Sequence, residues 1–302
     1  MASQLKAISP WRGVIALLVT PFHDDYSINE VALRDEVDWC FAHGATGVVA
    51  TPSIGEFVHL TDDERMRCFE ITLDQALKHE GATVLAVTAG PDTLVAMRFT
   101  RLARDMGFNG AMVIPPYYWR CGSEEVYEHY KMIAEGCDIP LVVYHNPALS
   151  KFHMSAEFMG RVTTLDRVVA VKEVETDLQH LEALVQAIRG KAAYFQTFRA
   201  YLTGRQLGSA GGFINVFAVP ACVAIDRALE AGDTARALEI QIRLNNCFPR
   251  GGEGALGHLG TTKLTASVAT GIEMGPARPP YRAPENARAL ITSRLPLLQE
   301  VL

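Results

Sequence analysis

Residues 168–173 read Val-Val-Ala-Val-Lys-Glu, and this stretch decides how the whole chain is interpreted. Four small or β-branched apolar residues in a row are typical of a strand buried on both faces, as in a parallel sheet. Lys172 stands where such a strand ends. Burial lowers the pKa of an amine, and a neutral amine forms Schiff bases with ketones. Taken alone, the stretch more often holds a lysine that reaches solvent or pairs with Glu173 or Glu175, so the rest of the chain must decide.

Similar apolar runs alternate with amphipathic helical patterns along the chain, which is the βα order of a parallel sheet. They predict eight strands, at residues 13–20, 46–51, 83–88, 110–115, 140–144, 168–172, 193–197 and 212–216. Eight strand–helix units of this length match a closed (β/α)8 barrel. A doubly wound open sheet is the alternative, but no glycine-rich turn follows the first strand.

The last part of the chain lacks further strand patterns. It reads as three helices, at residues 233–247, 256–270 and 284–301, joined by segments rich in Gly and Pro. We therefore predict an α/β fold, a (β/α)8 TIM barrel over residues 1–232 with a C-terminal three-helix extension, residues 233–302, packed on it.

Composition excludes several classes of function. A hydrophobic content of 49% and a charged content of 21% are typical of a globular protein with a sizeable core. The net charge of −6, without a Lys/Arg cluster, argues against a nucleic-acid or membrane surface. No apolar run has the length of a signal peptide core or of a membrane span. Six cysteines are scattered without a C-x-x-C pair, which predicts free thiols and a cytoplasmic location.

Catalytic residues of a barrel gather at the carboxyl ends of its strands. The predicted ends carry a lysine, tyrosines and hydroxyl residues, with neither a carboxylate pair nor a histidine. They are Thr20, Thr51, Ser53, Thr88, Tyr117, Tyr118, Tyr144, Lys172, Thr197 and Asn215. An imine-forming lysine needs a phenol and hydroxyls to move protons, and few charges nearby, so this set favours the Schiff-base interpretation.

Other motifs give weaker indications. The loop Pro52-Ser53-Ile54-Gly55-Glu56 could form a nest of N–H groups for a carboxylate, although alone it fits an ordinary βα loop. The histidines lack H-x-x-x-H and H-x-H spacings, so we predict no metal site and interpret His145 and His153 as hydrogen-bonding loop residues. Residues 252–257 match G-x-G-x-x-G but follow a helix, so no cofactor is predicted. Cys121 has no paired histidine and is interpreted as incidental.

These residues together resemble the dihydrodipicolinate synthase/N-acetylneuraminate lyase superfamily of class I, pyruvate-handling aldolases. The similarity runs over nearly the whole chain, from residues 11–14 to residues 275–280. The family's G-[ST]-T-G-E loop, P-Y-Y turn, Y-N-x-P turn and lysine strand are similar to residues 52–56, 116–118, 144–147 and 169–173.

The resemblance implies a role for four residues. Lys172 forms the imine with the keto carbon of pyruvate or another 2-oxo acid, and Tyr144 passes protons to and from the substrate. Ser53 links Tyr144 to Tyr118, which in this family is commonly donated across a subunit interface. Family members are most often homotetramers built as pairs of dimers.

The resemblance also implies the substrate contacts. The backbone amides of Ser53 and Ile54 hold the pyruvyl carboxylate, and the carbonyl of Ile214 lines the site. The predicted substrate-binding residues are Pro52, Ile54, Gly55, His145, Leu149, Phe152 and Ile214.

Departures from the family pattern bear on the second substrate. The synthase proper has an arginine five residues after the catalytic tyrosine, whereas Leu149 stands here, which argues against synthesis in the lysine pathway. Pro52 and Ile54 replace a glycine and a threonine and make the pocket more apolar. Residues 144–152 are similar both to the sialic-acid lyase turn Y-N-I-P-A-L-S and to the hydratase-aldolase turn A-N-P-x-x-F-K-F, while Glu173 is the synthase-like choice.

We therefore predict a Schiff-base (class I) aldolase or lyase that forms or cleaves a C–C bond between pyruvate and an aldehyde, as in a hydratase-aldolase for an apolar or aromatic aldehyde. Alternatives are a 2-keto-3-deoxy sugar acid dehydratase or aldolase, and an enzyme like 4-hydroxy-tetrahydrodipicolinate synthase. A keto-acid-binding protein without catalysis and a metal-dependent class II aldolase are further alternatives. The predicted partners are small-molecule substrates and copies of the same chain, with no nucleic acid and no membrane.

Overall fold

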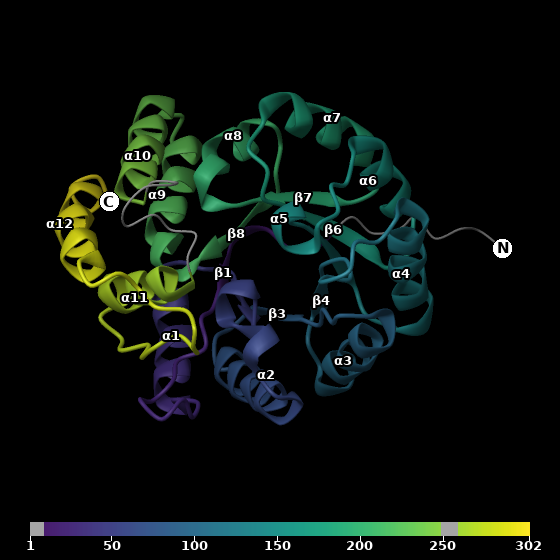
Figure 1. The fold of residues 1–302 in the computed structure, drawn as a ribbon. Helices are drawn as coiled ribbons and strands as arrows, with labels where there is room; N and C mark the ends of the chain where they lie inside the picture. Colours follow the sequence, from purple (N-terminus) through teal and green to yellow (C-terminus); the bar gives the residue numbers. More distant parts are fainter. Residues whose placement is uncertain (1–8, 249–258) are drawn as a thin grey trace. The chain divides into compact units, whose positions relative to one another are not determined.

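Eight parallel strands close into a barrel in chain order in the computed structural model, which describes residues 9–248 and 259–302 (Figure 1). The strands are β1 (Gly13–Leu17), β2 (Gly47–Ala50), β3 (Thr83–Val87), β4 (Gly110–Val113), β5 (Leu141–His145), β6 (Val168–Glu173), β7 (Ala193–Gln196) and β8 (Gly211–Asn215). Every residue of β2, β4, β5 and β6 is buried, as expected of strands covered on both faces. The predicted TIM-barrel fold is confirmed.

Helices follow the strands. Those of the barrel are α1 (Glu30–Ala42), α2 (Asp62–Ala76), α3 (Thr93–Met106), α4 (Ser123–Gly136), α5 (Pro147–Ser150), α6 (Ala156–Val162), α7 (Leu178–Ile188), α8 (Tyr201–Gln206) and α9 (Val219–Glu230). Short 3-10 helices are η1 (Ser53–Gly55), η2 (Phe57–His59), η3 (Phe198–Ala200) and η4 (Val216–Ala218). The C-terminal helices are α10 (Thr234–Cys247), α11 (Leu259–Thr270) and α12 (Ala287–Gln299).

The helix boundaries follow local signals in the sequence. Thr61 accepts a hydrogen bond from the N–H of Glu64, whose side chain accepts from the N–H of Thr61, so α2 begins with a capping box. Asp92 caps α3 in the same way by accepting from Val95, and Gly107 ends that helix with a φ of 96°. The sequence did not predict α5 and α8, because four and six residues are too few to show a helical period.

By compactness the chain divides into two units, each described by itself. One unit comprises the described residues up to Arg12 with Leu85–Phe213. In it β5 pairs with β6 so that Tyr144 stands opposite Lys172 and His145 opposite Glu173. This register places the two candidate catalytic residues side by side on neighbouring strands.

The other unit comprises Gly13–Val84 and Ile214–Leu302. An added Cβ at Gly47 of β2 would lie 2.3 Å from the carbonyl oxygen of Thr83, so only glycine fits there. In this unit α10 packs against α9, while α12 packs against α10 and α11 (Figure 1). The three predicted C-terminal helices are thus present, and the domain boundary at residues 232 and 233 stays a prediction.

Some predictions fall beyond the described part of the chain. The G-x-G-x-x-G match at residues 252–257 and the predicted helix start at residue 256 lie outside the described residues. Within residues 9–248 and 259–302, no helix combines the length and the apolar character needed to span a membrane.

Candidate active site

Lys172 and Tyr144 form a buried pair at the ends of β6 and β5. Their exposed fractions are 2% and 4%, and the Lys172 Nζ lies 3.9 Å from the centroid of the Tyr144 ring. Burial lowers the pKa of Lys172, while contact with the Tyr144 hydroxyl acts in the opposite direction. A larger fraction of the amine is therefore in the neutral, nucleophilic form than for a lysine in water.

A neighbouring residue holds the phenol oxygen of Tyr144. The Asn146 Nδ2 group donates a hydrogen bond of 2.9 Å to the Tyr144 hydroxyl. Asn146 is also the N-cap residue of α5, yet its side chain makes no capping bond to that helix. Asn146 was not among the residues predicted from the sequence, although an asparagine before a proline and two residues after Tyr144 was visible there.

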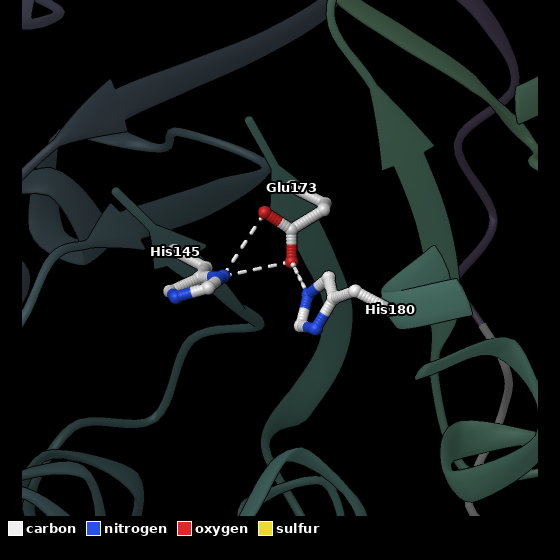
Figure 2. A group of neighbouring side chains, drawn as sticks. All are labelled: His145, Glu173 and His180. Atoms are coloured by element: carbon white, nitrogen blue, oxygen red, sulfur yellow. Dashed lines mark hydrogen bonds and ion pairs between the residues drawn. The ribbon is translucent and has the colours of Figure 1, made fainter. Parts of the chain in front are cut away.

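His145 and Glu173, which directly follow Tyr144 and Lys172, are buried and form a second group with the half-buried His180 of α7 (Figure 2). The Glu173 carboxylate lies 2.8 Å from His145 Nδ1 and 2.9 Å from His180 Nε2, and it accepts from the Glu175 N–H at 2.8 Å. Burial acts to raise the pKa of Glu173, but the hydrogen bonds from both histidines outweigh it and the pKa falls to about 2. The hydrogen bond to Glu173 raises the pKa of His180.

This group bears on two interpretations made from the sequence, of which the substrate-binding role of His145 stays a prediction. Within the described residues Lys172 forms no ion pair with Glu173 or Glu175, so the salt-bridge interpretation of Lys172 is not what the structure contains. His145, predicted as a substrate-binding residue, has both ring nitrogens engaged, because the Met154 N–H donates to its Nε2 at 3.0 Å. His145 is 28 positions from Glu173, and Glu173 is 7 positions from His180, so the three residues form no recognised sequence motif.

In the other unit, the loop after β2 is built as a tight turn. The Gly55 N–H donates to the Pro52 carbonyl, and Thr20 donates to the Gly55 carbonyl at 2.6 Å. An added Cβ at Gly55 would lie 2.9 Å from the Leu18 carbonyl oxygen, so the turn requires glycine. The Ser53 hydroxyl is buried without a hydrogen-bond partner among the described residues. A buried hydroxyl in that state points to a group supplied by a ligand, a water or another chain.

Glu56 anchors this loop to the C-terminal segment. Its carboxylate accepts from Lys263 Nζ at 3.0 Å, from the Arg278 N–H at 3.0 Å, and lies 3.1 Å from His59 Nδ1. Burial lowers the pKa of Lys263 to about 8, and the Glu56 charge acts against that fall. Lys263 was not predicted from the sequence, because it lies 207 positions from its partner Glu56.

Tyr118 lies at the surface with an exposed fraction of 73% and a φ of 81°. Its carbonyl accepts a 2.7 Å hydrogen bond from Lys151 Nζ, and Trp119 beside it is 79% exposed. Such a conformation is unusual for a residue with a Cβ, and two large exposed aromatic rings are typical of a contact surface.

The remaining predicted residues lie in both units. Leu149, on α5, is 47% exposed, and Phe152 is half-buried with its ring 5.2 Å from that of Phe158. Ile214, on β8, is fully buried. Cys121 is half-buried, and burial raises the pKa of its thiol, which disfavours a nucleophilic role.

A model of the Dihydrodipicolinate synthetase family matches residues 10–284. The chain belongs to this family. The chain is 31% identical over 238 residues to a 4-hydroxy-tetrahydrodipicolinate synthase of Methanothrix thermoacetophila, with 78% of this chain and 79% of the relative covered. The resemblance stated from the sequence is thereby confirmed.

Solved structures agree on the fold of this dihydrodipicolinate synthetase family member. YagE, a prophage protein from E. coli K12 in complex with pyruvate, superimposes with a TM-score of 0.86 at 19% identity, over 97% of this chain and 99% of YagE. CdNal from Clostridium difficile, in complex with mannosamine, gives 0.83 at 21% identity, over 97% and 100%. Members of the family are lyases that act as class I aldolases, and the chain is such an enzyme.

Proposed function

We propose that the chain forms or cleaves a C–C bond between pyruvate and an aldehyde through a Schiff base on Lys172. The observation that carries this proposal is the buried Lys172–Tyr144 pair, in which burial favours the neutral amine beside a phenol. Family membership supports the same chemistry.

Each step has a group on hand. The Lys172 amine adds to the keto carbon of pyruvate, and loss of water leaves a protonated imine. Tyr144 takes a C3 proton, which gives the enamine. C3 of the enamine then attacks the aldehyde carbon, and the aldehyde oxygen takes the proton from Tyr144 as it becomes a hydroxyl. In cleavage, Tyr144 accepts the C4 hydroxyl proton, the C3–C4 bond breaks, and its electrons move into the imine to give the enamine. A proton added to C3 then converts the enamine back into the imine of pyruvate. Water then hydrolyses the imine and frees Lys172.

We propose further roles for Ser53 and Tyr118, which rest on the family resemblance. Ser53 relays protons between Tyr144 and a Tyr118 donated by another copy of the chain, in a homotetramer made of two dimers. The unpartnered Ser53 hydroxyl and the exposed, left-handed Tyr118 support these roles. The backbone amides of Ser53 and Ile54 hold the pyruvyl carboxylate, and Pro52, Gly55 and the Ile214 carbonyl complete that end of the site.

The second substrate is proposed to be an apolar or aromatic aldehyde. Leu149 occupies the place of the synthase arginine, so no guanidinium from that position grips an aldehyde carboxylate, and Ile54 and Phe152 add apolar surface. A dehydratase acting on a 2-keto-3-deoxy sugar acid uses the same imine and differs in its product, a dehydrated keto acid instead of pyruvate and an aldehyde. A cytoplasmic location remains a prediction, consistent with six free thiols.

The test is borohydride reduction in the presence of pyruvate, followed by intact mass and peptide mapping. We expect the gain of one reduced pyruvyl group on Lys172. Lys172→Ala is expected to abolish the adduct, while Lys191→Ala, which removes a lysine bonded to the Gly160 and Ala187 carbonyls, keeps it. An adduct on another lysine, or full aldolase activity in Lys172→Ala, contradicts the proposal.

Two further measurements separate the alternatives. Products from a panel of aldehydes with pyruvate, analysed by mass, identify either a C–C bond or a dehydration. Activity that is lost in EDTA and restored by a divalent metal indicates a class II aldolase. An adduct without turnover on any aldehyde or sugar acid indicates a keto-acid-binding protein.

A further inference from the structure

Asn146 precedes the helix α5, but its side chain bonds to Tyr144 and not to the first turn of that helix. Asparagine is among the favoured N-cap residues because its side-chain oxygen accepts an orphan N–H of the first turn. At α5 that bond is absent, and the Nδ2 group instead donates to the Tyr144 hydroxyl at 2.9 Å. The Asn146 side chain therefore does not cap α5, and its amide donates to the phenol oxygen of Tyr144.

The Asn146 backbone is held firmly while its side chain reaches Tyr144. Its carbonyl oxygen accepts from the Leu149 N–H, the Ser150 N–H and the Ser150 hydroxyl, at 3.0–3.1 Å. The same Ser150 hydroxyl also contacts the backbone of Phe152, at 3.2–3.3 Å. Residues 146–152 thus form a turn closed by hydrogen bonds to the Asn146 carbonyl and the Ser150 hydroxyl.

The far end of this turn is fixed by the histidine–glutamate group. The Met154 N–H donates to His145 Nε2, and His145 Nδ1 in turn contacts Glu173 (Figure 2). Glu173 is further held by His180 of α7. Because successive residues of a strand face opposite sides, this group lies on the side of β5 and β6 away from Tyr144 and Lys172 and acts only through the backbone.

The tautomer of His145 follows from these contacts. A backbone N–H can only donate, so His145 Nε2 is an acceptor and its single proton lies on Nδ1, where it is donated to Glu173. A metal ion on Nδ1 would force that proton onto Nε2, against the Met154 N–H. The group of three potential metal ligands is therefore a hydrogen-bonded anchor rather than a metal site.

We propose that Asn146 is a positioning residue that stabilises the Tyr144 oxygen when the phenol has given up its proton, and that His145 holds the turn carrying Asn146 in place. A donor to an oxygen that becomes negative strengthens as the charge forms, so it favours the proton-transfer step over pyruvate binding. This inference rests on the proposed function, because it requires Tyr144 to move protons.

The experiment compares two steps in each variant with pyruvate alone. Borohydride trapping measures the imine on Lys172, and exchange of the pyruvate methyl protons in D₂O measures proton transfer. Asn146→Ala is expected to keep the imine and the KM for pyruvate and to slow exchange per trapped imine roughly 10- to 100-fold. Because Asn146 makes no side-chain cap, this variant is expected to fold normally. Asn146→Asp keeps an acceptor but removes the donor, and is expected to slow exchange as well.

A matched pair at His145 tests the anchor. The amide of Gln reaches the place of Nε2, so His145→Gln can still accept from the Met154 N–H, whereas the shorter Asn reaches only the place of Nδ1. Exchange is expected to stay within about 3-fold of the unaltered chain in His145→Gln and to fall about 10-fold in His145→Asn. An equal fall of the exchange rate in the two variants overturns the proposal that His145 holds the turn in place.

The outcomes separate this inference from the function on which it rests. An adduct on Lys172 with unchanged exchange in Asn146→Ala overturns the inference alone. No adduct in the unaltered chain removes the proposed function and the inference with it. Stoichiometric zinc that survives gel filtration and is lost in His180→Ala overturns the hydrogen-bonded assignment of the histidine–glutamate group.

Discussion

The contacts and the pKa of Glu173 predict both the size and the pH dependence of the stability change in Glu173→Gln. The side chain keeps its size, but one carboxylate oxygen becomes an NH₂ group. Both oxygens of Glu173 accept hydrogen bonds, from His145, His180 and the Glu175 N–H. An NH₂ group in either place faces a donor, and His145 cannot change tautomer because the Met154 N–H occupies its Nε2. The variant therefore either leaves a buried donor without an acceptor or forces His180 to give up its Nε2 proton, and in both cases it removes the carboxylate charge.

The pKa of Glu173 sets the size of the effect. Its ordinary value of 4.5 falls to about 2 in the folded chain, so the ionised carboxylate stabilises the fold. That contribution is fully present above pH 4.5 and is lost as the pH falls toward 2. At about 1.4 kcal/mol per pKa unit it amounts to about 3 kcal/mol at pH 6 and about 2 kcal/mol at pH 3.5. The raised pKa of His180 has the opposite dependence on pH. The stability that protonated His180 contributes is fully present below pH 6.5 and is lost as the pH rises through its raised pKa.

The assay is urea denaturation of the unaltered chain and Glu173→Gln at pH 6 and pH 3.5. We expect the variant to be less stable by about 3 kcal/mol at pH 6, with the gap narrowing at pH 3.5. Glu182→Gln makes the same chemical change at an exposed position of α7 and is expected to stay within about 0.5 kcal/mol. A gap below about 1 kcal/mol at pH 6, or one that does not change with pH, refutes this reasoning.

Four further predictions follow from single contacts. Tyr144→Phe is expected to keep the imine but slow pyruvate proton exchange by roughly 10²–10⁴-fold, and unchanged exchange contradicts Tyr144 as proton carrier. Adduct formation on Lys172, followed against pH, is expected to reach half its maximal rate below 10.5, because burial lowers the pKa of the amine; a midpoint at 10.5 or above argues against it. Thr61→Ala breaks the capping box and is expected to lower the free energy of unfolding by about 1 kcal/mol in urea, which a neutral result would contradict. Gly47→Ala places a Cβ 2.3 Å from the Thr83 carbonyl oxygen and is expected to lower the free energy of unfolding by roughly 1–3 kcal/mol. A variant as stable as the unaltered chain would rule out this packing.

The sequence predicted the fold because the barrel is built from local patterns. Each buried strand is an apolar run, and the capping box at Thr61 lies within four residues, so both are visible without knowledge of the rest of the chain. The short helix α5 has no period to detect and was missed. Boundaries differ by a residue or a few, as at β8, where the predicted strand 212–216 is Gly211–Asn215.

The candidate site was predictable only where neighbouring strands share a register. Tyr144 and Lys172 end adjacent strands, so the barrel order alone brings them together. The contacts of Glu173 with His145 and of Glu56 with Lys263 join residues 28 and 207 positions apart. Such pairs depend on how side chains fill the space between elements, which a pattern along one chain does not encode.

The alternation of faces along β5 and β6 has a consequence for directed evolution. Tyr144 and Lys172 point to one side of the strands, and His145 and Glu173 hold the following turns from the other side. The proposed chemistry and the positioning of the turns therefore depend on different residues. On the proposed function, a library that varies Leu149, which is half exposed, changes the predicted contact with the aldehyde and leaves these four residues unaltered. In a library that includes positions 145 and 173, variants are expected to lose the hydrogen bonds that hold these turns in place. Selection for a new aldehyde therefore starts best from positions on α5, with both strand ends left as they are.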